Sequence, residues 1–339
     1  MPTVTVGTAR VHYDIEGPAP ATPSHSASVT ASAPATPSHS ASVTASAPAT
    51  ATATATGLPH PPPGRLPALL LVHGTGSGGA VVNWGRTAPR FTDGRHEARH
   101  EARGEGRGEE RHEARGEGQA EERHARTVIT PDLSGADRTV DDGGPLTVET
   151  LAAQVVAVIE DAGTGPVDLL GFSMGAPVAA AVAALRPDLV NRLVLVAGWA
   201  YTDGDEYLRN LFALWQRLGE QDPAGFGRFV TMTGFSRDFL NAIGREEVEA
   251  LIPNMPPTPG TLRHVAVDRA VDVRALLPLI TAPTLVIGCA RDATVPVENS
   301  RELAAAITGS TYAEIDAGHV VFFEKEDEFV KTVTDFLAG

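Results

Sequence analysis

A serine inside a glycine-flanked pentapeptide is the strongest chemical signal in the sequence. Residues 171–175 read Gly-Phe-Ser-Met-Gly and fit the pattern G-x-S-x-G, between an apolar run that begins at Val167 and a segment of small residues. A serine on a sharp strand-to-helix turn exposes its hydroxyl, and its neighbours must be small for the turn to close. The flanks favour this geometry over a chance glycine-rich turn, so we interpret Ser173 as a nucleophile.

A serine hydroxyl is a weak nucleophile on its own and needs a nearby base. His319 ends the segment Asp-Ala-Gly-His at 316–319, which overlaps the end of a strand-like run at 311–317 and precedes a helical pattern. The other histidines of the patterned chain fit less well, because His12 lies in a predicted edge hairpin and His264 in a helix-rich segment. We therefore expect His319 to be the base, with a buried structural histidine as the alternative interpretation.

A histidine base must be oriented, usually by a carboxylate. Asp292 follows the apolar run at 283–290 and gives the chain order nucleophile, acid, base. Asp203 and Asp205 are rivals, because they follow the neighbouring run at 192–199 and could reach the histidine from there. We expect these two to be solvated loop residues and Asp292 to be the acid.

A glycine-rich loop, His-Gly-Thr-Gly-Ser-Gly-Gly at 73–79, follows another apolar run. It lacks the Lys-Ser/Thr ending of a phosphate-binding P-loop and does not fit the G-x-G-x-x-G pattern of dinucleotide sites. An oxyanion loop fits better: the backbone N–H groups of Thr75 and Met174 would donate to the oxygen that becomes negative in a tetrahedral intermediate. We interpret His73 as a structural hydrogen-bonding residue of this loop.

These residues must be positioned by strands and helices, and the sequence contains both patterns. Alternating apolar and polar residues predict an antiparallel edge hairpin at 3–6 and 9–16. Strand-like runs, most of them typical of buried parallel strands, follow at 67–74, 127–133, 167–173, 192–199, 283–290 and 311–317. Helical spacing predicts helices at 146–163, with Thr147 as a cap, and at 174–187, 298–307 and 326–337. The pattern predicts an α/β fold with a mostly parallel eight-stranded sheet flanked by helices.

The alternation stops between residues 200 and 281, after the sixth strand. This segment is helical in pattern and rich in aromatic residues. Its place in the chain predicts a helical cap over the carboxyl ends of the strands, and its apolar content predicts a small hydrophobic substrate. As wall residues we predict Trp199, Val295 and Val320, which adjoin the catalytic positions.

Two low-complexity stretches interrupt the pattern, at 18–64 and 94–126. The first contains a 14-residue sequence repeated letter for letter, and the second repeats an Arg-, Glu- and Gly-rich unit. Almost no large apolar side chain occurs in either, so we predict disordered inserts, with a rigid or glycosylated stalk as the alternative for the first. Seven of the 11 histidines lie in them at irregular spacing, which does not indicate a metal site.

The composition limits the classes of partner. A formal charge of −15 disfavours binding to nucleic acid, which normally needs a basic face. The single cysteine, Cys289, excludes an intramolecular disulfide and is interpreted as a packed apolar residue. The sequence has neither an export signal nor an apolar run long enough to span a membrane, so we expect a cytoplasmic protein. We expect no metal or cofactor, and a small-molecule substrate as the partner. The oligomeric state is left open.

The segments HGTG, PDLSG, GFSMG, CARDATVP and DAGH occur in the order seen in proteins of the α/β-hydrolase fold. The chain resembles this family over nearly its whole length apart from the two inserts. The resemblance implies a hydrolase core at 1–199 and 282–339 and a cap at 200–281. One departure is visible: residues 136–139 read Ala-Asp-Arg-Thr, where many relatives have a His-Gly-Arg-Ser type of turn.

By that resemblance Ser173, Asp292 and His319 take the positions of a catalytic triad, and Thr75 and Met174 those of the oxyanion donors. Relatives that use an aspartate nucleophile, such as haloalkane dehalogenases and epoxide hydrolases, are disfavoured by the serine. Hydrolysis of an ester-like bond through an acyl-enzyme is the leading interpretation. Carbon–carbon bond hydrolase, lactonase, cofactor-free perhydrolase or haloperoxidase, and a non-catalytic ligand-binding member of the fold remain alternatives.

Overall fold

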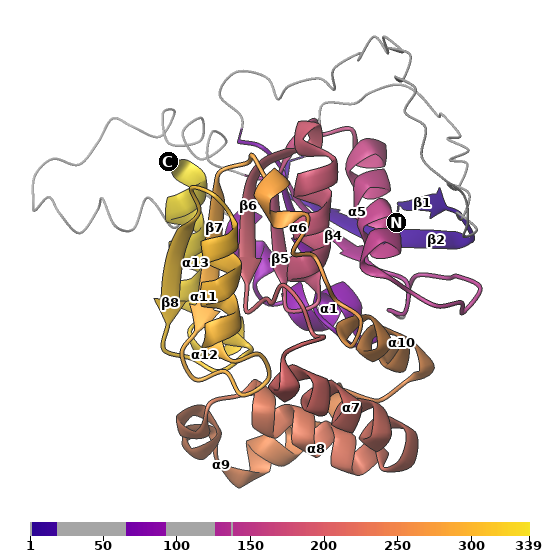
Figure 1. The fold of residues 1–339 in the computed structure, drawn as a ribbon, viewed down its shortest axis with the longest axis vertical. Coiled ribbons are helices and arrows are strands. Elements are labelled where there is room, and N and C mark those ends of the chain that lie inside the picture. Colours follow the sequence, from indigo (N-terminus) through magenta and orange to yellow (C-terminus); the bar gives the residue numbers. More distant parts are fainter. Residues whose placement is uncertain (1, 19–65, 93–125, 137) are drawn as a thin grey trace, which may run out of the picture.

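The strands of the described residues form a single sheet (Figure 1). The computed structural model describes residues 2–18, 66–92, 126–136 and 138–339. The strands are β1 (Thr3–Val6), β2 (Ala9–Glu16), β3 (Leu69–Val72), β4 (Val128–Asp132), β5 (Val167–Phe172), β6 (Val190–Val196), β7 (Thr284–Cys289) and β8 (Thr311–Ile315). They lie in the order β1-β2-β4-β3-β5-β6-β7-β8. The β1–β2 and β2–β4 pairs are antiparallel and the other pairs are parallel, so the predicted eight-stranded, mostly parallel sheet is confirmed.

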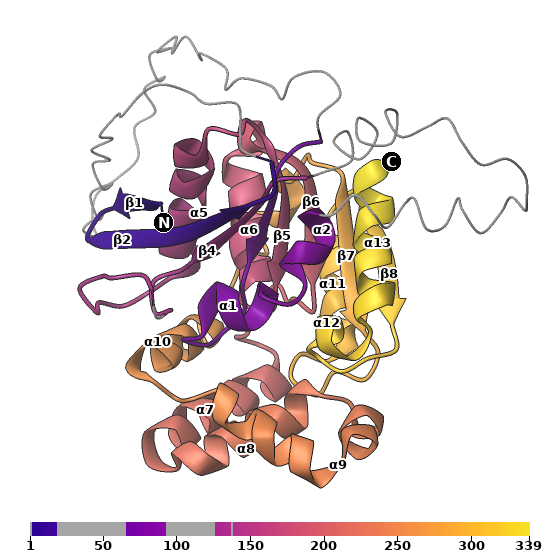
Figure 2. The same cartoon turned by 180° about the vertical axis from the view of Figure 1, so that it is seen from behind.

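The central strands β3, β5 and β7 are buried along their whole length because helices cover both faces of the sheet (Figures 1 and 2). In β3, Leu70 and Val72 belong to the core on one face, whereas Leu69 and Leu71 belong to the core on the other. Successive side chains of a strand point to opposite faces, so a strand between two layers is buried on both sides and is mostly apolar.

Four of the covering helices match the predicted ones, namely α5 (Val148–Ala162), α6 (Gly175–Leu185), α11 (Val297–Ala306) and α13 (Glu326–Ala338). Thr147 caps α5 as predicted, because its hydroxyl accepts the Thr150 N–H while the Thr150 hydroxyl accepts the Thr147 N–H. The short helices α1 (Gly79–Trp84), α2 (Ala88–Thr92) and α12 (Val321–Glu324), and the 3₁₀ turns Pro187–Leu189, Ile252–Asn254 and Leu277–Leu279, are additional.

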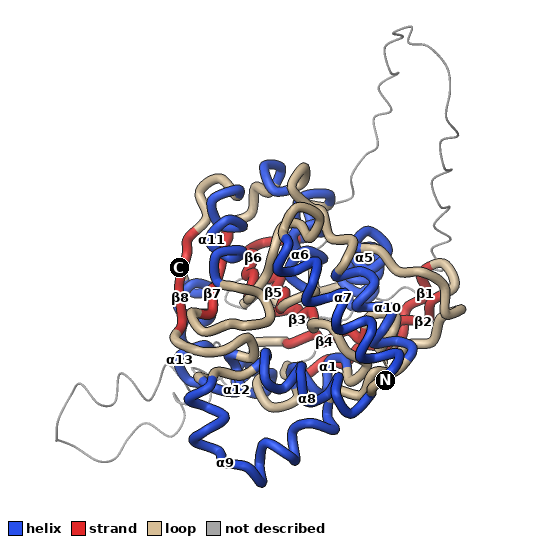
Figure 3. Tube along the Cα trace, turned by 60° about the horizontal axis from the view of Figure 1, so that its bottom comes forward, coloured by secondary structure: helices blue, strands red, loops and turns tan. Residues whose placement is uncertain are grey.

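Between β6 and β7 the chain forms α7 (Glu206–Gln221), α8 (Pro223–Gly234), α9 (Arg237–Leu251) and α10 (Pro259–Asp268). All four begin at side-chain caps, since Asp205, Asp222, Ser236 and Thr258 each accept a backbone N–H three residues on. Figure 1 shows α7, α8 and α9 as a separate layer beyond one end of the sheet, and Figure 3 turns that end towards the viewer. This end is where the parallel strands finish.

The two predicted disordered inserts lie, apart from their edges, outside the described residues. One edge needs a correction: Arg126, which we place in the second insert, is buried and its guanidinium pairs with the buried carboxylate of Asp168. The ordered chain therefore includes Arg126, one residue before the β4 region predicted at 127–133.

Candidate active site

The turn between β5 and α6 holds Ser173 in a left-handed backbone conformation, with a φ of 54°. Such a φ is uncommon for a residue other than glycine and is typical of strained functional positions. The turn is closed by its glycines: a Cβ on Gly171 would lie 2.1 Å from the Gly175 carbonyl oxygen, and one on Gly175 would lie 2.5 Å from the Val72 carbonyl oxygen. Ser173 thus stands at the carboxyl end of a central strand, as the pentapeptide pattern predicts.

Ser173, His319 and Asp292 form one hydrogen-bonded chain, although 119 and 27 residues separate Ser173 from Asp292 and Asp292 from His319 along the sequence. His319 Nε2 lies 2.9 Å from Ser173 Oγ, and Nδ1 lies 2.6 Å from Asp292 Oδ2. A carboxylate can only accept from Nδ1–H, so Nε2 is left to accept the serine proton. Ser173 and His319 are each 6% exposed. The arrangement can remove a proton from the serine hydroxyl in a largely desolvated site.

Both carboxylate oxygens of Asp292 are hydrogen-bonded. Oδ1 accepts the backbone N–H groups of Thr294 and Val295, each at 2.8 Å, while Oδ2 faces His319. Its side chain is 1% exposed. These bonds fix the carboxylate in the orientation that the histidine requires.

The rival carboxylates lie elsewhere. Asp205 accepts the Leu208 N–H through Oδ1 and the Asn299 side chain through Oδ2, so it caps α7 and tethers that helix to α11. The side chain of Asp203 is 91% exposed and lies 3.9 Å from the guanidinium of Arg209. Among the described residues, neither contacts His319.

The glycine loop after β3 lies directly beside the serine, since a Cβ on Gly74 would be 3.0 Å from Ser173 Cβ. Side chains hold its backbone: the N–H of Gly74 donates to Asn83, that of Gly76 to His264 and that of Ser77 to Thr261. Within the described part of the chain, no hydrogen-bond acceptor is recorded for the backbone N–H groups of Thr75 and Met174. These are the two groups that the sequence suggests as oxyanion donors.

His73 stabilises the same loop through hydrogen bonds to backbone groups. Its Nδ1–H donates to the Gly74 carbonyl at 2.7 Å and its Nε2 accepts the Leu133 N–H at 3.0 Å. The ring is fully buried, and burial lowers the pKa of His73 below its usual value. Both nitrogens are used by the backbone, in agreement with the structural role expected of this histidine.

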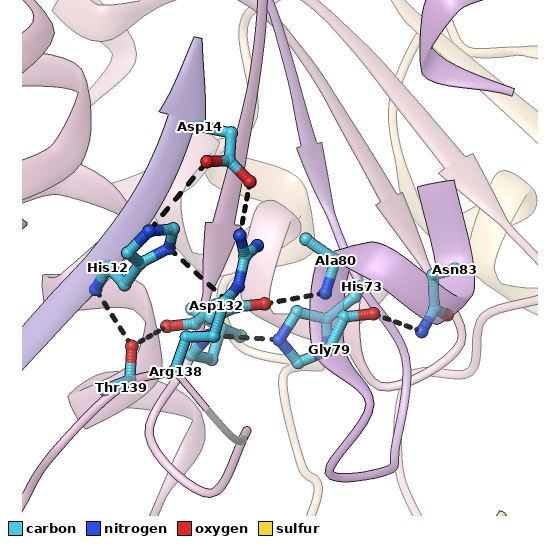
Figure 4. Close-up of polar contacts among 10 residues, drawn as sticks. His12, Asp14, His73, Gly79, Ala80, Asn83, Asp132, Arg138 and Thr139 are labelled. Atoms are coloured by element: carbon cyan, nitrogen blue, oxygen red, sulfur yellow. Dashed lines mark hydrogen bonds and ion pairs between the residues drawn. The ribbon is translucent and has the colours of Figure 1, made fainter. Parts of the chain in front are cut away.

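A partly buried polar cluster behind the loop fixes the start of α1 (Figure 4). Asp132, at the end of β4, accepts the Ala80 N–H at 2.7 Å, and a Cβ on Gly79 would lie 2.3 Å from the same oxygen. Arg138 binds the other oxygen of Asp132 and reaches Asp14 at 2.6 Å. Arg138 belongs to the Ala-Asp-Arg-Thr segment that departs from the pattern of many relatives, and through these contacts it still supports the loop.

The same cluster ties the edge hairpin to that turn. The Thr139 hydroxyl donates to the Asp132 carbonyl and accepts the His12 N–H at 3.0 Å (Figure 4). The ring of His12 lies 3.5 Å from Asp132 and 3.8 Å from Asp14. His12 therefore belongs to the support of the loop and does not approach Ser173 through any recorded contact.

A cavity of about 290 Å³ opens onto Ser173 and His319. Its wall is mostly apolar and comes from the core and from α7, α8, α9 and the segment before α10. It includes Val82, Phe172, Trp215, Val230, Thr231, Gly234, Phe235, Leu251, Met255, Val320, Phe322 and Phe323. The cap residues in this set come from the aromatic-rich segment at 200–281. Their positions could not be assigned from spacing alone.

Of the three predicted wall residues, only Val320 lines this cavity. Trp199 instead packs on Phe212, with ring centroids 5.4 Å apart, and its indole N–H donates to Thr202. Val295 is buried and contributes its backbone N–H to Asp292. Trp199 and Val295 lie close in sequence to the ends of β6 and β7, but their side chains pack in the hydrophobic core.

Cys289 lies beneath the histidine, with its sulfur 4.0 Å from the His319 carbonyl oxygen. It is buried, and burial raises the pKa of its thiol well above the ordinary value. The thiol form is inert, which agrees with a packed apolar role. Among the residues that the structure describes, no group of three His, Cys, Asp or Glu side chains is arranged to hold a metal ion. No helix in the same residues is long and apolar enough to cross a membrane.

Comparison with known proteins adds three findings. A family model described as alpha/beta hydrolase fold matches residues 105–326. The sequence is 35% identical over 277 residues to pyrrolizixenacetamide deacetylase from Xenorhabdus hominickii, covering 81% of this chain and 92% of that protein. The fold is similar to the enol-lactonase from Burkholderia xenovorans LB400, with a TM-score of 0.67, 19% identity and full coverage of both chains. It is also similar to an esterase from Exiguobacterium antarcticum, with a TM-score of 0.64 and 15% identity over 98% of this chain and 96% of that one.

Proposed function

The chain belongs to the α/β-hydrolase family, and from this premise we propose that it is a serine hydrolase that transfers a short acyl group from an ester or amide to water. The observation that carries the proposal is the hydrogen-bonded chain of Ser173, His319 and Asp292 at the wall of an apolar cavity. The deacetylase relative supports hydrolysis of an acyl bond, and its name extends the proposal from esters to acetamides.

In the first half of the proposed reaction, His319 Nε2 accepts the proton of Ser173 while the serine oxygen attacks the carbonyl carbon. The carbonyl oxygen becomes negative and accepts hydrogen bonds from the backbone N–H groups of Thr75 and Met174. When the intermediate collapses, His319 returns the proton to the leaving alcohol or amine, and the acyl group stays on the serine. Asp292 holds the imidazole and stabilises its charged form throughout.

Water completes the cycle. His319 removes a proton from water as its oxygen attacks the acyl-enzyme, a second oxyanion forms at the same donors, and the proton passes to the departing Ser173 oxygen. A carboxylic acid is released and the resting enzyme is restored. The steps need only these side chains, two backbone N–H groups and water.

A fluorophosphonate probe tests the proposed nucleophile. The activated serine oxygen should attack phosphorus and expel fluoride, so the folded protein is expected to gain one covalent adduct, located at Ser173 by peptide mass spectrometry. Heat-denatured protein is the control and should remain unlabelled, because only the folded chain places the histidine beside the serine. If folded protein also remains unlabelled, the chain is instead a non-catalytic member of the fold.

Gly234, the last residue of α8, should limit the size of the acyl group that the cavity accepts. This glycine lines the cavity, and a Cβ there would lie 3.6 Å from Val320, an ordinary contact, so a side chain can be added without displacing backbone. We expect Gly234→Val to lower kcat/KM for a hexanoyl ester about tenfold or more relative to the acetyl ester, because one lost methylene site in an apolar pocket has an effect of this order. Met232→Ala, on the same helix and 61% exposed, is the control. Equal ratios in the two variants would place the acyl group elsewhere.

A further inference from the structure

A carboxyl group outside the triad is attached to the oxyanion loop. Asp268, the last residue of α10, is completely buried, and its Oδ2 accepts the hydroxyl proton of Thr75 at 2.7 Å. Its other oxygen, Oδ1, is buried and has no hydrogen-bond partner among the described residues. The mechanism above gives this carboxyl group no role.

Among the described residues, none places a positive charge beside Asp268. His264, one turn earlier on α10, has its pKa lowered to about 3 by burial, and burial also lowers the pKa of His73. The arginines of this segment do not compensate either, since Arg263 binds Asp141 and Arg269 is exposed.

Thr202, which also contacts Asp268, is neutral as well. Thr202 donates to the backbone oxygen of Asp268 at 2.6 Å and leaves the side chain untouched. A fully buried carboxylate with one hydrogen bond and no cation is strongly unfavourable, so the group is held in its uncharged form. In agreement with this geometry, burial raises the pKa of Asp268 to about 8.

The charge of Asp268 matters because Thr75 lies on the wall of the catalytic cavity. The side chain of Thr75 binds Asp268, while its backbone N–H is the proposed donor to the oxyanion. A negative charge at Asp268 would repel the oxyanion in a site with little water to screen it. A neutral acid keeps the loop in place without this repulsion.

We propose that Asp268 positions Thr75 as an uncharged acid, and that ionisation of Asp268 disables the oxyanion loop. The inference rests on the proposed function and adds regulation of the same site by pH. Asp268 acts through Thr75 and does not touch the substrate, so it is a positioning residue.

The experiment compares pH profiles for hydrolysis of 4-nitrophenyl acetate, with the Ser173→Ala protein as the blank. In the native protein kcat/KM should fall about tenfold to thirtyfold from pH 7 to pH 9.5, as an acid titrating near pH 8 loses its proton. Asp268→Asn keeps an acceptor for Thr75 and cannot ionise, so its kcat/KM should stay within about twofold over this range. Asp272→Asn, at an aspartate that is 48% exposed and paired with Arg274, should keep the native decline.

The variant Asp268→Ala tests whether the hydrogen bond to Thr75 is needed for catalysis. It removes the acceptor for Thr75, so kcat at pH 7 should fall about tenfold, and the asparagine variant should recover most of that loss. Equal losses in both variants, or an alkaline decline that persists in Asp268→Asn, would overturn the inference.

Thermal unfolding tests the charge state without any substrate. Unfolded Asp ionises near pH 4, whereas folded Asp268 keeps its proton to about pH 8, so the native protein loses stability as pH rises through this window. Asp268→Asn should therefore unfold about 5–10 °C higher than the native protein at pH 8 and show no such gain at pH 4. A chain that hydrolyses neither an ester nor an amide refutes the proposed function, and this measurement still decides whether Asp268 is uncharged. An equal midpoint at both pH values would overturn the inference.

Discussion

Replacement of Ser173 by Ala is expected to lower kcat for ester hydrolysis about 10⁴–10⁶-fold, the loss seen when the nucleophile of a cooperative triad is removed. The reason is that His319 then has no hydroxyl to deprotonate and the acyl-enzyme route is closed. The oxyanion donors and the cavity remain, so some hydrolysis by bound water should survive above the uncatalysed rate. Steady-state kinetics with an activated acetyl ester measure both quantities.

A matched serine provides the control for this substitution. The Ser310 hydroxyl donates to the Ala304 carbonyl at the end of α11 and has no recorded contact with the catalytic chain, so Ser310→Ala should retain native kcat. Both variants should give the native circular dichroism spectrum. A loss of less than tenfold for Ser173→Ala, with the fold intact, would show that the serine is not the nucleophile.

The sequence allowed the positions of the candidate triad to be predicted because parallel strands finish at one edge of a sheet. Ser173, Asp292 and His319 each follow a strand pattern, so predicting the strands placed all three at the same edge. The small residues around Ser173 gave a second, independent signal, since the turn cannot close with a Cβ at Gly171 or Gly175.

The cap was predicted as a segment but its contacts were not. The aromatic residues of 200–281 indicate an apolar layer, yet Trp215 reaches the cavity whereas Phe212 packs against Trp199. Which side of a helix faces the site depends on how the cap sits on the core, and that placement is made by tertiary contacts. One such contact is the Val320 N–H, which donates to the Gly234 carbonyl at 3.0 Å.

Asp268 could not be recognised for a related reason. Nothing in the local sequence distinguishes it from Asp272 four residues later, which is 48% exposed and paired with Arg274. Only the fold brings α10 against the loop after β3, more than 190 residues earlier, and removes water from the carboxyl group. Burial without a charged partner is a property of the packed molecule and leaves no local pattern.

Asp292→Asn is the second substitution with a large expected effect, a fall in kcat of about 10⁴-fold, by analogy with the same change in a serine protease triad. The amide keeps the size of the side chain, and its oxygen can still accept the N–H groups of Thr294 and Val295. Its NH₂ group then faces His319, which favours the imidazole tautomer with the proton on Nε2. That tautomer cannot accept the proton of Ser173.

Asp205→Asn is the matched control, because asparagine caps helices as well as aspartate does and Asp205 has no recorded contact with His319. We expect it to keep kcat within about threefold. The two variants together show which aspartate orients His319. An active Asp292→Asn with an inactive Asp205→Asn would assign this role to Asp205, which follows β6. The geometry favours the end of β7. Asp292 accepts two backbone N–H groups and lies 2.6 Å from His319, whereas both oxygens of Asp205 are bonded to Leu208 and Asn299.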